Sequence, residues 1–199
     1  LEKAPLRQKK NKVLIKMKQY KTILVALMFT FCGQLIAEDL KGTSKGKLRN
    51  KPKESAIKVS GDWIEHYEAH SNPSINYRLM KPFGFNEQKQ YPVIVSLHGA
   101  GGKGSDNRKQ LRDWNKLLTD KKRRTDYPCY VLAPQTTQLW NKDDLKKIKS
   151  IIAGLPAVDM DRIYILGHSM GGHGTFILIQ IDPNYFAAAA PSAGSGSVS

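Results

Sequence analysis

Short hydrophobic runs alternate with helix-like segments along the second half of the chain. Four runs rich in β-branched or small apolar residues predict buried strands, over residues 91–97, 129–133, 162–166 and 186–190. The segments between them predict helices, over residues 106–120, 143–155 and 172–181. This alternation favours an α/β fold with a mostly parallel sheet and helices on both faces.

A period-2 alternation ahead of these strands predicts a β-hairpin over residues 62–81, with its turn in the Ser-Asn-Pro-Ser sequence at 71–74. Residues 38–61 are polar and rich in glycine and lysine, so they predict a flexible linker. The four consecutive basic residues of Lys121–Arg124 predict a solvent-exposed loop.

The first methionine is Met17, and it opens a segment with the layout of a secretory signal peptide. Two lysines follow it, then a largely apolar stretch that ends near Ala37, where we expect cleavage. This predicts a secreted or periplasmic protein. A membrane anchor is the alternative, although the apolar stretch is shorter than the roughly 20 residues that a spanning helix needs. Residues 1–16 are then an upstream extension outside the mature protein.

The composition excludes several classes of protein. The 199 residues fit one domain or part of one, and 40% hydrophobic content excludes disorder throughout. Two cysteines cannot build a disulfide scaffold, and no Cys/His cluster has zinc-ligand spacing, so we expect no metal or cofactor. The net charge is +15, but eight of the basic residues lie in 1–37. We therefore expect no nucleic-acid partner, and membrane contact only through an uncleaved N-terminal segment.

One motif carries specific chemistry: Gly167-His168-Ser169-Met170-Gly171, which reads G-x-S-x-G. It lies between a predicted strand and a predicted helix, which is the context that a nucleophilic serine elbow requires. The two glycines leave room for a tight turn that holds the serine hydroxyl clear of the sheet. The motif predicts Ser169 as a nucleophile and the Met170 N–H as a donor to an oxyanion.

A second oxyanion donor is expected from the glycine-rich sequence at 98–102, His-Gly-Ala-Gly-Gly, which follows the strand at 91–97. The carboxyl ends of parallel strands meet at one edge of a sheet, so this loop and Ser169 should lie close together. Either Ala100 or Gly101 would donate its N–H, and the sequence leaves that choice open.

Three blocks of sequence resemble α/β-hydrolases of the secreted esterase type: VIVSLHGAGGKGSDN, PCYVLAPQ and DRIYILGHSMGGHGTFILIQIDPNYFAAAAPSAG. These blocks are similar to those of the phospholipase/carboxylesterase, feruloyl-esterase and polyhydroxybutyrate-depolymerase-like enzymes. The resemblance implies a three-layer sandwich over 62–199 and hydrolysis of carboxylic esters through an acyl-enzyme on Ser169. It implies a small-molecule or polymeric ester as substrate.

The acid and the base of the catalytic triad are expected outside this chain. In these enzymes the order is serine, then Asp or Glu, then His. Only His173 and Asp182 follow the serine, and they lie on the next helix and in the turn after it. We therefore expect the N-terminal part of a hydrolase domain, with little or no activity in residues 1–199 alone. Two alternatives remain: a serine peptidase of the prolyl-oligopeptidase type, and a non-catalytic binding protein with the same fold.

Overall fold

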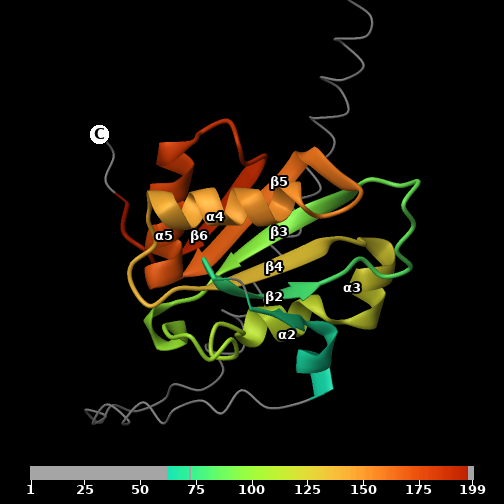
Figure 1. The fold of residues 1–199 in the computed structure, drawn as a ribbon, viewed down its shortest axis with the longest axis horizontal. Helices are drawn as coiled ribbons and strands as arrows, with labels where there is room; N and C mark the ends of the chain where they lie inside the picture. Colours follow the sequence, from blue (N-terminus) through green and yellow to red (C-terminus); the bar gives the residue numbers. More distant parts are fainter. Residues whose placement is uncertain (1–61, 72, 197–199) are drawn as a thin grey trace, which may run out of the picture. The chain divides into compact units, whose positions relative to one another are not determined.

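The computed structural model describes residues 62–71 and 73–196 (Figure 1). The predicted upstream extension, signal peptide and linker lie outside the described residues. Among the residues that are described, no helix combines the length and the apolar character needed to cross a membrane.

The described strands form one sheet in the order β1-β2-β4-β3-β5-β6. Their bounds are Glu68–His70 (β1), Asn76–Met80 (β2), Tyr91–Leu97 (β3), Tyr130–Gln135 (β4), Val158–His168 (β5) and Ala188–Ser192 (β6). Strands β4, β3, β5 and β6 are parallel, whereas β1 and β2 pair antiparallel at one edge. Each strand predicted from the sequence overlaps an observed one, which confirms the mostly parallel sheet.

Helices cover both faces of this sheet. The α-helices are Asp113–Leu118 (α2), Lys121–Asp126 (α3), Lys142–Ala153 (α4) and Met170–Ile181 (α5), and the 3-10 helices are Asp62–His66 (η1) and Ala100–Gly102 (η2). Helices α4 and α5 lie over the face of the sheet that is turned to the viewer in Figure 1.

Two hydrophobic clusters hold the layers together, one on each face. Along β4, Tyr130 and Leu132 belong to the larger cluster, which includes α4 and α5. Val131 and Ala133 belong to the smaller one, with Leu118 of α2 packed against it. Successive strand residues point to opposite faces, so a run that is apolar at every position fits a strand buried on both sides.

The predicted hairpin is wrong in its first half. Residues 62–66 form the 3-10 helix η1, and the Tyr67 N–H donates to the Ile64 carbonyl at 2.9 Å. Only β1 pairs with β2, with Glu68 opposite Leu79. The Tyr67 side chain is buried and its hydroxyl donates to the Asn115 carbonyl, so packing overrides the period-2 pattern here.

The basic run at Lys121–Arg124 is also not a loop, because it forms most of α3. The Asp120 carboxylate accepts the Arg123 N–H at 3.0 Å and so caps the helix. Lys122 pairs with Asp126 one turn later. The residues themselves are largely solvent-exposed, as predicted.

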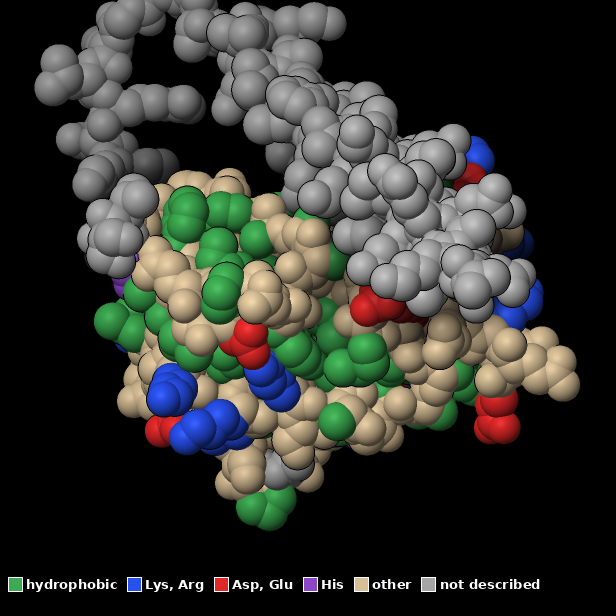
Figure 2. Space-filling model, turned by 90° about the horizontal axis from the view of Figure 1, so that it is seen from above, with side chains coloured by type: hydrophobic (Ala, Val, Ile, Leu, Met, Phe, Trp, Pro, Cys, Tyr) green, Lys and Arg blue, Asp and Glu red, His purple; other side chains and the backbone are tan. Residues whose placement is uncertain are grey.

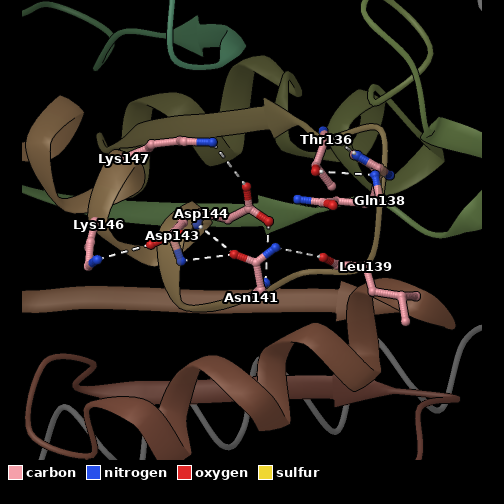
Figure 3. A network of polar contacts seen from close by, with 9 residues as sticks. Thr136, Gln138, Leu139, Asn141, Asp143, Asp144, Lys146 and Lys147 are labelled. Atoms are coloured by element: carbon pink, nitrogen blue, oxygen red, sulfur yellow. Dashed lines mark hydrogen bonds and ion pairs between the residues drawn. The ribbon is translucent and has the colours of Figure 1, made fainter.

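Helix α4 begins in a reciprocal cap, which Figure 3 shows. The Asn141 side chain accepts the N–H groups of Asp143 (2.8 Å) and Asp144 (3.3 Å). The Asp144 carboxylate accepts the Asn141 N–H in return. This cap fixes the start of α4, and Trp140, which precedes it, is buried beside the loop that follows β3.

Strand β6 is paired on one side only within the described residues, with β5. Four of its five residues are partly exposed. Seen from above, hydrophobic side chains form scattered groups on the visible described surface, among backbone and polar atoms and several charged side chains (Figure 2).

Candidate active site

Ser169 lies at the turn between β5 and α5, and it is exposed. Its backbone has φ 56° and ψ −119°, a conformation that non-glycine residues rarely adopt. Two hydrogen bonds hold this strained turn: the Ser169 N–H donates to the Ser192 carbonyl, and the Ser169 carbonyl accepts the His173 N–H, both at 2.9 Å. Such strain persists only where the surroundings enforce it, and it is typical of functional sites.

The glycines of the motif are required by close backbone contacts. A Cβ atom at Gly167 would collide with the Gly171 carbonyl, and one at Gly171 would collide with the Leu97 carbonyl. The second contact presses the start of α5 against the end of β3. The spacing of the motif therefore reflects how tightly the serine turn packs on the neighbouring strand.

The glycine loop after β3 lies beside this serine. A Cβ atom at Gly99 would lie 3.6 Å from the Ser169 Cβ and 3.1 Å from the His168 carbonyl oxygen. Ala100 and Gly101 are the first two residues of η2, and their N–H groups have no acceptor among the described residues. The structure thus brings together the two sequence elements that were expected to meet.

His98 holds the glycine loop in place. Its Nε2 accepts the Thr136 N–H at 3.1 Å, so Nδ1 carries the proton and donates to the Gly99 carbonyl at 2.8 Å. The Trp140 indole N–H donates to the His98 carbonyl at 3.1 Å. The pKa of His98 is lowered to about 4, mainly by burial, with a smaller contribution from the nearby charges of Arg112 and Lys103. His98 is therefore a neutral structural residue.

Gln135, the last residue of β4, anchors the same loop. Its amide nitrogen donates to the Gly102 carbonyl (3.0 Å) and to the Asp106 carboxylate (2.9 Å), and its amide oxygen accepts the Asn107 N–H (2.6 Å). The sequence reasoning missed Gln135, although it ends one of the resembling blocks. The helix predicted over 106–120 forms only as α2. Asn107, which is bonded to Gln135, has a positive φ of 50°, and a helix cannot continue through that backbone conformation.

The histidines do not supply a base to Ser169. His66 lies against Arg124, His70 stacks on Tyr77, and the ring of His173 bonds to the Ser195 carbonyl at 2.6 Å. His168 is exposed and neighbours the indole of Trp114, at 6.1 Å between ring centres. Within residues 62–71 and 73–196, the Ser169 hydroxyl makes no hydrogen bond to a histidine or a carboxylate.

The acidic side chains give the same picture. Asp182, at the end of α5, pairs with Lys149, and this interaction holds the pKa of the carboxyl below its usual range. No group of three or more His, Cys, Asp and Glu side chains in the described part of the chain could hold a metal ion. The described site therefore consists of a strained serine and backbone donors.

Known proteins resemble this chain mainly in structure; no family model matches it. A thermostable esterase is 34% identical, with a TM-score of 0.62, over 68% of this chain and 43% of that one. A feruloyl esterase module from Clostridium thermocellum is 16% identical, with a TM-score of 0.52, over 67% and 54%. An acetyl xylan esterase from Aspergillus awamori is 16% identical, with a TM-score of 0.50, over 65% and 52%.

One sequence relative also matches, a secreted protein of uncharacterized role from Arthroderma benhamiae. It is 30% identical over 146 residues, which is 62% of this chain and 15% of that protein. The chain thus spans less than half of the thermostable esterase and a small part of the fungal relative. At the lower identities, the likeness to solved structures is one of fold.

Proposed function

We propose that this chain, which has the α/β-hydrolase fold of the esterase type, cleaves carboxylic esters through an acyl-enzyme on Ser169. One observation supports this most strongly. The strained, exposed serine lies directly beside a glycine loop whose leading N–H groups have no acceptor among the described residues. A nucleophile and donors for the negative charge of a tetrahedral intermediate need this juxtaposition.

In the proposed reaction, the Ser169 oxygen attacks the ester carbonyl carbon and gives its proton to a base. The carbonyl oxygen becomes an oxyanion that accepts the N–H of Met170 and that of Ala100 or Gly101. The intermediate then expels the alcohol, which takes the proton from the base, and leaves an acyl group on Ser169. Water hydrolyses this acyl-enzyme by the same sequence, which releases the acid and restores the serine.

The acid and the base of this proposal lie outside the described residues. None of the described histidines makes a hydrogen bond to the Ser169 hydroxyl, and His98 is held neutral. The partly exposed edge of β6 leaves room for further strands, whose loops would carry an Asp or Glu and then a His in the order of the fold.

We further propose that the protein is secreted or periplasmic and acts on small-molecule or polymeric esters. Support for secretion comes from the predicted signal peptide at 17–37 and from the description of the fungal relative as secreted. Feruloyl esters and acetylated xylan are candidate substrates to test, because a feruloyl esterase module and an acetyl xylan esterase share this fold.

A substrate panel tests the proposal. The complete protein that contains this chain is assayed with p-nitrophenyl acetate, methyl ferulate and a peptide p-nitroanilide, as wild type and as Ser169→Ala. We expect ester cleavage that the substitution abolishes, and little or no turnover by residues 1–199 alone. Cleavage of the peptide only would favour a peptidase of the prolyl-oligopeptidase type. No turnover of any substrate would favour a binding protein.

A further inference from the structure

Two basic side chains border the glycine loop at the proposed site. The Arg112 guanidinium lies so close to Gly101 that a Cβ atom there would collide with its Nη2. Lys103 directly follows η2 and is exposed. Both side chains are near enough to His98 for their charges to lower its pKa. The loop that would hold the oxyanion is therefore flanked by two cations.

Neither cation has an acidic partner within residues 62–71 and 73–196. The carboxylate of the loop itself, Asp106, is occupied by Lys109 at 3.2 Å and by the Gln135 amide. The guanidinium of Arg112 also donates no hydrogen bond to a described residue. A partly buried guanidinium with free donors is suited to bind an anion from outside.

The backbone of Arg112 is fixed, so its side chain starts from a defined place beside the glycine loop. The Asn115 side chain accepts the Arg112 N–H at 2.9 Å, and the Asn115 N–H donates to the Arg112 carbonyl at 2.8 Å. Asn115 is tied in turn to the hydroxyl of Ser96 on β3, at 3.1 Å. The start of α2 is thus anchored to the strand that carries the glycine loop.

Trp114, two residues after Arg112, lies near the nucleophile. Its indole N–H donates to Ser96 at 2.8 Å, and its ring neighbours that of His168, the residue before Ser169. One short segment therefore places Arg112 against the oxyanion loop and Trp114 against the serine turn.

We propose that Arg112, assisted by Lys103, binds a carboxylate of the substrate next to the scissile ester, so that the site selects esters that carry an anionic group. This inference rests on the proposed function and adds the substrate class. Arginine suits the role because its planar fork matches a carboxylate and keeps its charge at every working pH. The carboxylate can belong to the acyl part or to the alcohol part of the ester, and the two sources are tested separately.

The first experiment measures binding without chemistry, by calorimetry on the complete protein carrying Ser169→Ala. The ligands are monomethyl succinate (carboxylate on the acyl part), acetoxyacetate (carboxylate on the alcohol part) and neutral dimethyl succinate. We expect at least one anion to bind about tenfold or more tighter than the neutral ester, since hydrogen bonds to charged groups contribute this much. The anion that binds identifies the side of the ester that Arg112 reads.

Variants assign the preference to the guanidinium. Adding Arg112→Gln should remove the preference, Arg112→Lys should retain part of it, and Arg123→Gln, an exposed arginine on α3, should leave it unchanged. Melting temperatures check that each variant is folded. If Arg112→Gln does not fold, Arg112→Lys still tests the role of the guanidinium. Equal affinity for charged and neutral ligands, or a preference unchanged by Arg112→Gln, overturns the inference.

Kinetics separate this inference from the proposed function. With active protein, Arg112→Gln should raise KM for the preferred anionic ester about tenfold more than it raises KM for p-nitrophenyl acetate, which carries no anionic group. Hydrolysis of neutral esters without an anion preference means that the function holds and the inference fails. Arg112-dependent anion binding without hydrolysis of any ester means the reverse. Equal loss on neutral and anionic esters also overturns the inference, because Arg112 would then act on the oxyanion.

Discussion

Gly99 and Ser169 lie side by side although they are far apart in the sequence: a Cβ atom at Gly99 would be 3.6 Å from the Ser169 Cβ. This contact joins the loop after β3 to the turn after β5, at the carboxyl edge of the sheet. The separation leaves no room for a larger side chain between nucleophile and loop. The parallel register of the two strands therefore builds the candidate oxyanion site before any substrate arrives.

The close contact of Gly171 with β3 should make substitution of this glycine destabilising. Gly171→Ala would push a Cβ atom into the Leu97 carbonyl, and backbone on both sides cannot yield easily. We expect a loss of about 1–3 kcal/mol or more in the free energy of unfolding. Urea unfolding measures it. Gly154→Ala is the matched control, because its Cβ atom would meet the Ile151 carbonyl at an ordinary 3.5 Å, and it should change stability by less than about 1 kcal/mol.

Because Gln135 anchors the glycine loop, its removal should lower the activity. Gln135→Ala would leave the Gly102 carbonyl and the Asn107 N–H without their partners and loosen the glycine loop. We expect kcat for ester hydrolysis to fall at least about tenfold, since small misplacements of catalytic donors are costly. The free energy of unfolding should fall by about 2 kcal/mol or more. Gln138→Ala, an exposed amide close by, should do neither, and a similar effect of both substitutions would argue against the anchoring role.

The burial of His98 leads us to expect that stability depends on pH. The pKa of His98 in the folded protein is about 4, below the ordinary value of 6.5, so between these pH values the unfolded chain binds a proton that the folded chain does not bind. The stability linked to His98 is therefore complete above pH 6.5 and is lost as the pH falls from 6.5 to 4, by about 3 kcal/mol in total.

Urea unfolding of the wild type and of His98→Gln between pH 4 and pH 7 checks this. The substituted protein should be less stable throughout, because the bonds to Thr136 and Gly99 change, but its stability should vary less with pH. Parallel curves for the two proteins would show that His98 does not carry this pH dependence.

The sequence predicts the sheet and the motif well because both depend on local patterns. The apolar run of β3 and the strand–turn–helix around Ser169 are encoded by adjacent residues. The first half of the hairpin was predicted wrongly because Tyr67 is buried against Asn115, a contact that no local pattern reveals. The role of Gln135 was missed for the same reason, since it depends on a loop that is distant in sequence.

The basic run of α3 shows a different limit. Lys121–Arg124 was predicted as a loop on the basis of charge, yet exposure and helix formation are compatible when a cap and an ion pair are present. Asp120 and Asp126, which flank the run, are the residues that would have signalled the helix.

The assignment of Ser169 as the nucleophile can be tested by labelling the complete protein with a fluorophosphonate probe and mapping the modified residue by mass spectrometry. An activated serine forms a stable adduct with such a probe, whereas an ordinary surface serine does not. We expect one adduct, on Ser169, that is absent from Ser169→Ala. Labelling at another serine, or no labelling of a folded complete protein, would contradict the assignment of Ser169 as the nucleophile.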